Sequence, residues 1–219
     1  MQTRALLNEE LIQIRRELQL MAARVDADIG KALSVLRSGD IELADEVRKS
    51  GKIVDAMQLK IEDMAFVLIA TQQPVARDLR ELISVFKITS GLERIGDHSI
   101  HLVNTAVKLS GLPSFRFIER IERMAVTGQE MLKAAFSAYL VQDARAAREA
   151  AALDRIIDEE HEALTEEALA LMKKQPPLIK DATRIIRLSG YMERLGDHIT
   201  NICEGIVFMI ESRHEELND

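Results

Sequence analysis

The sequence has little of several residue types, and each shortage excludes a class of protein. A single cysteine, Cys203, among 219 residues excludes an internal disulfide and suits a reducing compartment. Aromatic residues make up only 4% of the chain, there is no tryptophan, and proline and glycine number four and ten. Strands are enriched in aromatic and β-branched residues, whereas Ala, Leu, Ile, Glu and Arg dominate here. The composition therefore predicts a few long helices.

Long apolar runs and basic blocks are also lacking. Apolar runs such as Ala65–Ala70 are far shorter than the roughly 20 residues of a spanning helix. The chain passes from Met1 directly into amphipathic, charged sequence, without the apolar stretch of a signal peptide. Net charge is −7 and the 29 basic residues form no block, so nucleic-acid binding is not expected. We expect a cytoplasmic protein that reaches a membrane only through its partners.

Turn signals divide the chain into six segments. The breaks fall at Ser38-Gly39-Asp40, Thr71–Pro74, Ser110–Ser114, Gln142-Asp143 and Gln175-Pro176-Pro177. Within the segments apolar residues recur at helical spacing, as at Leu7, Leu11, Ile14 and Leu18. Asp40 is placed to cap the second helix, and helices of about 30 residues are typical of bundles.

The second half of the chain repeats the first. Four pairs of acidic residues carry the repeat: Asp40 and Asp143, Asp55 and Asp158, Glu93 and Glu193, and Asp97 and Asp197. The first two pairs are 103 residues apart and the last two are 100 apart. Repetition at this scale predicts an all-α fold of two tandem three-helix bundles related by a pseudo-twofold. We expect the first to span residues 1–111 and the second residues 112–219, with the third helix of each packed centrally.

One acidic motif occurs once in each half, inside the third helix. It reads ERIGDH at 93–98 and ERLGDH at 193–198. A Glu and an Asp four residues apart share one helix face and repel by a few tenths of a kcal/mol, and a helical glycine costs about 1 kcal/mol. Because both costs recur at equivalent places, they indicate a role that offsets them. A bound cation would remove the repulsion, and glycine would let a neighbouring helix or a ligand approach.

The middle segment of each half supplies opposing carboxylates. In the second half these are Asp154 and Asp158, but in the first half Gly51 accompanies Asp55. The candidate metal ligands are therefore Asp55, Glu93, Asp97, Asp154, Asp158, Glu193 and Asp197. Carboxylates favour hard or borderline cations such as Mg, Mn, Fe or Zn. We expect tighter binding in the second repeat, and we expect the crowded acids to raise one another's proton affinity.

Other interpretations of these residues remain open. Arg94 and Arg194 could neutralise the acids in a surface salt-bridge lattice, which would leave a plain helical scaffold. Bridged metals could activate water in a metalloenzyme. The chain has no phosphate-binding glycine loop or nucleophile motif, and His161 lacks the second histidine of a zincin helix because Thr165 stands there. We expect His98 and His198 to be outer neighbours of the acids or surface groups.

Three strings together resemble the PhoU family. They are QPVARDLR at 73–80, LERIGDH at 92–98 and MERLGDHITNICE at 192–204, and the resemblance extends over essentially the whole chain. It implies tandem three-helix bundles, a homodimer, and iron, zinc or other divalent ions at the acidic motifs. It also implies a non-enzymatic regulator that connects a phosphate ABC transporter to a sensor histidine kinase and represses the phosphate-starvation response.

The first half departs from the family pattern. Gly51 stands where the family often has an acid, and His101 and Asn104 occupy the positions that Asn201 and Glu204 fill in the second half. The first site is therefore expected to bind fewer ions or a different metal, or to recruit His101. The resemblance leaves open regulation of a transporter for another solute.

Overall fold

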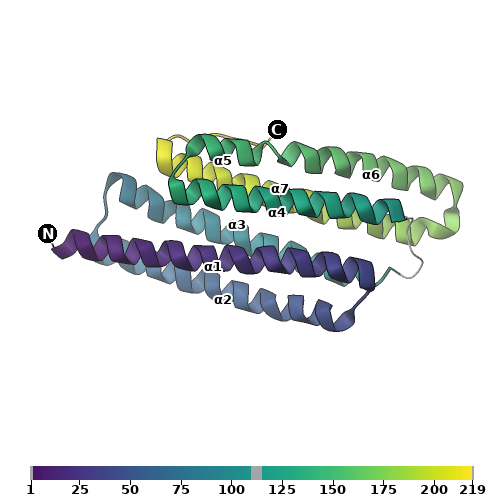
Figure 1. Cartoon of the computed structure of the whole chain (residues 1–219), viewed down its shortest axis with the longest axis horizontal. Coiled ribbons are helices and arrows are strands. Elements are labelled where there is room, and N and C mark those ends of the chain that lie inside the picture. The colour runs from purple at the N-terminus through teal and green to yellow at the C-terminus, as the bar shows by residue number, and fades with distance from the viewer. Residues whose placement is uncertain (1, 110–114, 219) are drawn as a thin grey trace.

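The computed structural model describes residues 2–109 and 115–218. The first bundle contains α1 (Gln2–Ser38), α2 (Ile41–Gln72) and α3 (Ala76–Ala106). The second contains α4 (Phe115–Val141), α5 (Ala144–Ala151), α6 (Asp154–Lys174), the 3₁₀ turn η1 (Pro176–Leu178) and α7 (Ile179–Glu211). No strand occurs in these two ranges, so the all-α tandem arrangement is confirmed (Figure 1). The predicted boundary at 111/112 lies outside the described residues.

The two repeated junctions form the same helix cap. The carboxylate of Asp40 accepts from the backbone N–H groups of Glu42 and Leu43 at 2.9 and 3.1 Å. Asp143 accepts from the N–H groups two and three residues later, at 2.9 and 3.0 Å. An aspartate in this position satisfies N–H groups that the first helical turn leaves without partners. The residue before each cap, Gly39 or Gln142, has a positive φ, which ends the preceding helix.

The fifth segment differs from the single helix that the sequence predicts. It is divided into α5 and α6, with Ala152 and Leu153 between them. At the break the hydrogen bonds change register, because the N–H of Leu153 bonds to the carbonyl of Ala150 at 3.3 Å and that of Ile156 to the carbonyl of Leu153 at 3.0 Å. Neither glycine nor proline marks this position, so the sequence carries no signal for the break. Asp154 consequently begins a new helix.

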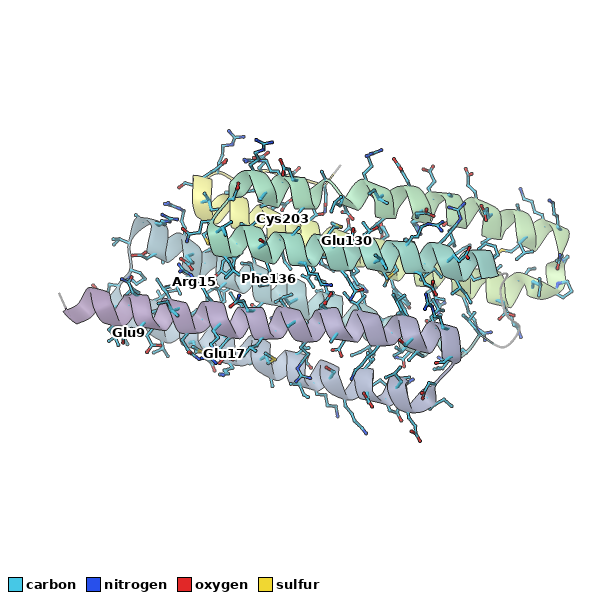
Figure 2. The ribbon with its side chains drawn as sticks, in the orientation of Figure 1. Glu9, Arg15, Glu17, Glu130, Phe136 and Cys203 are labelled. Carbon is cyan, nitrogen blue, oxygen red and sulfur yellow. The ribbon has the colours of Figure 1, made fainter. Side chains whose placement is uncertain are left out.

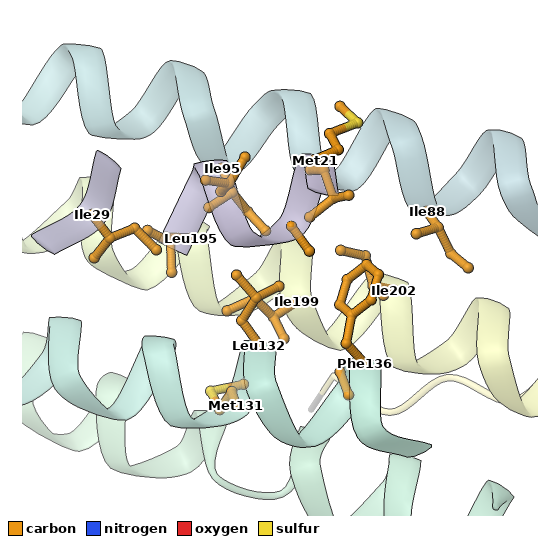
Figure 3. Close-up of a cluster of buried hydrophobic side chains, with 14 of the residues drawn as sticks. Met21, Ile29, Ile88, Ile95, Met131, Leu132, Phe136, Leu195, Ile199 and Ile202 are labelled. Atoms are coloured by element: carbon orange, nitrogen blue, oxygen red, sulfur yellow. The ribbon is translucent and has the colours of Figure 1, made fainter. Parts of the chain in front are cut away.

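Helices α3 and α7 run antiparallel and pack against each other between the two bundles (Figure 1). Ser84 Oγ on α3 donates to the carbonyl of Gly205 on α7 at 3.0 Å. Ile95 and Leu195, the same position of the two motif copies, are both fully buried in the shared core, shown in Figure 3. The predicted central position of the third helices is therefore confirmed.

Polar contacts to the buried Glu81 link α1 and α3 within the first bundle, and α4 of the second bundle. Arg15 on α1 (Figure 2) donates from Nε and Nη2 to Glu81 on α3 at 2.6 and 2.7 Å. The hydroxyl of Tyr139 on α4 donates to the same carboxylate at 3.5 Å. Pairing a buried charge in this way avoids the cost of leaving it unsatisfied.

Of the helices in the described ranges, not one combines the length and hydropathy that crossing a membrane requires.

Candidate metal centre

The acids of the second repeat line a cavity of about 270 Å³ where α5, α6 and α7 meet. Asp154 and Asp158 come from α6 and Asp197 from α7, and Arg155 lies among them. The structure thus brings together three of the four acids that the sequence predicts for this repeat. Glu193, the fourth, lies one turn before Asp197 and is close enough for its charge to act on Asp154.

Asp154 is the most unusual of these acids, because its side chain is only 8% exposed. Thr200 Oγ1 on α7 donates to Asp154 Oδ2 at 2.9 Å, whereas Asp154 Oδ1 is buried without a hydrogen-bond partner. Burial raises the pKa of Asp154 to about 7; the Thr200 hydrogen bond opposes this shift, and the charges of Asp158, Asp197 and Glu193 add to it. A buried carboxylate oxygen without a partner fits a site that accepts a proton or a cation.

Gly196 makes this close approach of α6 and α7 possible. A Cβ added at Gly196 would overlap Asp154 Oδ1 and lie 3.1 Å from Ile157 Cδ1. The sequence-based interpretation that the motif glycine admits a neighbouring helix holds for this repeat. At Gly96 the same atom would make an ordinary 3.5 Å contact with Val54 Cγ1, so the first repeat does not require the glycine sterically.

The half-buried acids of the second motif also bind protons more tightly than usual. The pKa of Glu193 is raised, first by burial and then by the charge of Asp197. The pKa of Asp197 is raised by burial, with the charge of Arg194 opposing it. Both pKa values are raised, as we expect for acids crowded together. However, removal from water contributes more than like-charge repulsion does.

The first repeat has an apolar contact where the second has a polar one. Gly51 occupies the position of Asp154, and Ile100 occupies that of Thr200. The Cδ1 of Ile100 fills the space that a side chain at Gly51 would need. A hydrogen-bonded acid in one repeat is therefore replaced by hydrocarbon packing in the other.

The remaining acids of the first repeat are partly neutralised. Arg94 Nε lies 3.5 Å from Glu93 Oε2, and Arg94 Nη1 lies 4.0 Å from Asp97 Oδ2. Burial raises the pKa of Glu93, and the charges of Asp97 and Asp55 add to the shift. These contacts resemble the salt-bridge lattice considered from the sequence.

The carboxylates of the second repeat are ligands that a hard cation prefers, and Asp154 among them is buried. Their side chains do not, however, converge on one point. Within residues 2–109 and 115–218, no three His, Cys, Asp or Glu side chains are placed so that they could hold a metal ion together. Metal binding by the seven candidate acids therefore stays a prediction. The buried, unpartnered oxygen of Asp154 is the feature of the site that favours it.

The two motif histidines meet between α3 and α7, and His98 is buried there instead of being a surface group. His98 and His198 stack on each other across the α3–α7 interface, with ring centroids 5.3 Å apart. Tyr191 and His101 lie beside them, with ring centroids 5.2 Å apart and the two rings tilted by 31°. Burial lowers the pKa of His98 to about 4, and the charges of His198 and His101 add to the shift. The rings meet because the pseudo-twofold brings the two motif copies together.

Two features of this site were missed from the sequence. Thr200 could have been found, since Ile100 and Gly51 change together to Thr200 and Asp154 between the repeats. Leu217 and Asn218 also line the acidic cavity, and no sequence signal places the residues after α7 there. The ring of His101 contacts those of His98 and Tyr191, and Asn104 accepts from Arg48 Nε at 2.8 Å.

The PhoU domain model matches the chain twice, at residues 18–106 and 121–206. The chain belongs to the PhoU family. A PhoU homologue of Clostridium acetobutylicum, named a phosphate-specific transport system accessory protein, is 30% identical over 99% of this chain and 100% of its own. The Borreliella burgdorferi protein of the same name is 35% identical over 83% of this chain and 84% of its own.

Solved structures of PhoU proteins have the same fold. The crystal structure of PhoU from Pseudomonas aeruginosa superposes with a TM-score of 0.89 at 29% identity, covering 94% of this chain and 99% of that one. The phosphate transport system regulatory protein PhoU from Streptococcus pneumoniae gives a TM-score of 0.88 at 29% identity, over 95% of this chain and 99% of that one. These PhoU relatives are accessory and regulatory proteins of transport, so the family is one of regulators and not of enzymes.

Proposed function

We propose that this PhoU-family chain regulates phosphate transport and phosphate-starvation signalling without catalysing a reaction. In this proposal it works in the cytoplasm as an adaptor between a phosphate ABC transporter and a sensor histidine kinase. The observation that supports it most is the end-to-end similarity to an accessory protein of phosphate-specific transport, over 99% of this chain and all of the relative.

A surface of the first bundle supports binding to protein partners. A groove of about 560 Å³ runs between α1 and α2, and Leu6, Val67 and Leu68 contribute to its lining. Val67 on α2 is 61% exposed, and Leu6 on α1 is 45% exposed. Exposed apolar side chains gathered at a groove are typical of interfaces. We propose that this surface joins two copies of the chain in a homodimer.

One solution experiment tests both parts of this proposal. Light scattering after size exclusion should give twice the chain mass, and a further complex should form with the cytoplasmic part of a phosphate transporter or of its kinase. The double change Leu6→Asp and Val67→Asp should give monomers, because it would bury two charges at the contact. Ile41→Asp, at an exposed site at the start of α2, is the control and should remain dimeric. A monomeric parent chain that binds neither partner would contradict the proposal.

We also propose that the second repeat holds a divalent or ferric cation, such as Fe, Zn, Mn or Mg. Its ligands would be Asp154, Asp158, Glu193 and Asp197. The ion would supply positive charge to the buried carboxylates and fix the angle between α6 and α7, with no chemical step. The first repeat lacks the buried acid, so we expect weaker binding there by Asp55, Glu93 and Asp97.

The two repeats can be compared through one matched pair of variants. Asp197→Asn should lower the affinity for Zn²⁺ at least tenfold, whereas Asp97→Asn should leave the tightest site intact, because each carboxylate supplies both charge and a ligand. Affinity should also fall as pH drops below about 7, since Asp154 must lose its proton to bind. Calorimetric titration at pH 6 and pH 8 measures both effects.

Two results would contradict the expectation that the second repeat binds the cation more tightly than the first. Loss of the tight site in Asp97→Asn but not in Asp197→Asn would place the metal in the first repeat. Absence of binding by the parent chain would favour the salt-bridge scaffold, in which Arg94 neutralises Glu93 and Asp97 as it does in this structure.

A further inference from the structure

The residues after α7 fold back over the second bundle. Helix α7 ends at Glu211, and Ser212 takes a left-handed conformation with φ 61°. Residues 212–218, here called the C-terminal strap, then run beside α5 toward the break between α5 and α6 (Figure 1). The strap has no helical structure of its own apart from the turn at its start. Its position therefore depends on the side chains that hold it.

One arginine of α5 and one aromatic stack hold the first part of the strap. Arg148 Nη2 lies 2.6 Å from Glu211 Oε2 at the end of α7 and 2.7 Å from Glu215 Oε2 in the strap. The ring of His214 stacks on Phe208, with centroids 4.3 Å apart and planes within 15°. Arg148 thus joins α5, α7 and the strap in one ion-pair network.

The last part of the strap is fixed directly beside the acidic cavity. The backbone N–H of Leu217 donates to Glu204 Oε1 on α7 at 3.0 Å. Glu204 also pairs with Lys87 on α3 at 2.7 Å. Leu217 and the neighbouring Asn218 form one wall of the cavity that Asp154, Asp158 and Asp197 line. The strap consequently covers one side of the cavity, while Asp158 stays exposed to solvent.

We propose that the C-terminal strap is a lid that controls how fast a cation enters and leaves the acidic cavity. This inference rests on the cation site proposed above for the second repeat. The strap can open at small cost, because its ion pairs are partly exposed and such pairs contribute little to stability. Segments held by a few exposed contacts belong to the least stable part of a fold.

The first repeat has no equivalent of this lid in the described residues. Its third helix, α3, ends at Ala106, and the chain then continues toward the second bundle. Asn104 stands at the position of Glu204, and its side chain accepts from Arg48 instead of a returning backbone. The strap therefore gives the two repeats different access to solvent, in addition to their different acids.

The lid is tested by releasing it without touching the acids. Arg148→Gln removes the network that holds Glu211 and Glu215, and a chain ending at Glu211 removes the strap itself. Zn²⁺ suits the measurement because it binds more tightly than Mn²⁺ or Fe²⁺ at most sites. Its release into an excess of a chromogenic chelator can be followed by stopped flow. We expect release at least tenfold faster in both variants than in the parent chain.

Arg145→Gln is the matched control. Arg145 lies on the same helix, α5, but pairs with Glu149 within that helix at 2.8 Å, with both side chains exposed. The Arg145→Gln variant should release Zn²⁺ at the same rate as the parent chain. Equal release rates in the parent, Arg148→Gln and the shortened chain would overturn the lid while leaving the cation site standing. Equal acceleration by Arg145→Gln would also overturn it, since α5 rather than the strap would then be responsible. A parent chain that binds no Zn²⁺ would overturn the cation site, and the lid with it.

Discussion

Replacing Asp154 by asparagine should make the metal-free protein more stable at pH 8 than the parent chain, by up to about 4 kcal/mol. The ordinary pKa of an aspartate is about 3.9, whereas burial raises that of Asp154 to about 7. At pH 8 the parent therefore keeps an ionised, buried carboxylate with one unpartnered oxygen. Asparagine carries no charge and can still accept the hydrogen bond from Thr200.

The pH dependence follows from the direction of this shift. Between pH 4 and pH 7 the folded state holds a proton on Asp154 that the unfolded state has lost. The contribution of this group to stability is therefore full below about pH 4 and is lost as pH rises through about 7. The difference in unfolding free energy between Asp154→Asn and the parent should be small at pH 4.5, intermediate at pH 6 and largest at pH 8.

Urea unfolding in the presence of a chelator, at pH 4.5, 6 and 8, measures this difference. Glu166→Gln is the control, because Glu166 is an exposed acid further along the same helix, α6; the stability of this variant should differ little from that of the parent at each pH. An Asp154→Asn protein that is less stable than the parent at pH 8 would contradict the argument. Adding a tightly bound cation should reduce the advantage of the variant, since the ion stabilises the charged acid of the parent.

The parts of the fold that could be predicted from the sequence depend on local signals. Apolar periodicity defines the long helices, and Asp40 and Asp143 cap them with the hydrogen bonds that their positions indicate. The repeat predicts the pairing of bundles, because equivalent helices in a duplicated chain can pack about a twofold axis. The break before Asp154 has no such signal, since it comes from a change in backbone hydrogen bonding among ordinary helix-forming residues.

The candidate site could be predicted only in part, because its main features join residues far apart in the chain. The sequence indicates the acids and the need for a motif glycine, and it even suggests which repeat is richer in carboxylates. It does not show that Asp154 is buried against Gly196, or that His98 stacks on His198. These contacts depend on how helices cross, which periodicity does not determine. The strap is a tertiary contact of a short non-helical segment, and composition carries no information about it.

The two motif glycines should respond to alanine in opposite ways. Gly196→Ala should destabilise the protein by about 1–3 kcal/mol, the usual cost of overpacking a core. Its Cβ would overlap Asp154 Oδ1 and crowd Ile157. Asp154 would have to turn away and lose the hydrogen bond from Thr200. Gly96→Ala should instead be neutral or stabilising by up to about 1 kcal/mol, because alanine is the better helix former and its Cβ meets Val54 at 3.5 Å.

Gly96→Ala is thus the matched control for Gly196→Ala: the same substitution at the equivalent position of the other repeat. Thermal unfolding of the two variants and the parent should order them with Gly196→Ala lowest, several degrees below the parent, since 1 kcal/mol shifts the midpoint by roughly 2–4 °C in a chain of this size. When Asp154 is also changed to alanine, the smaller side chain at 154 should relieve the overlap, so Gly196→Ala should cost less in that background than in the parent. The same cost in both backgrounds, or equal losses at Gly96 and Gly196, would mean that the glycine is not kept for the approach of Asp154. In that case the close contact of α6 with α7 would not be what distinguishes the second repeat from the first.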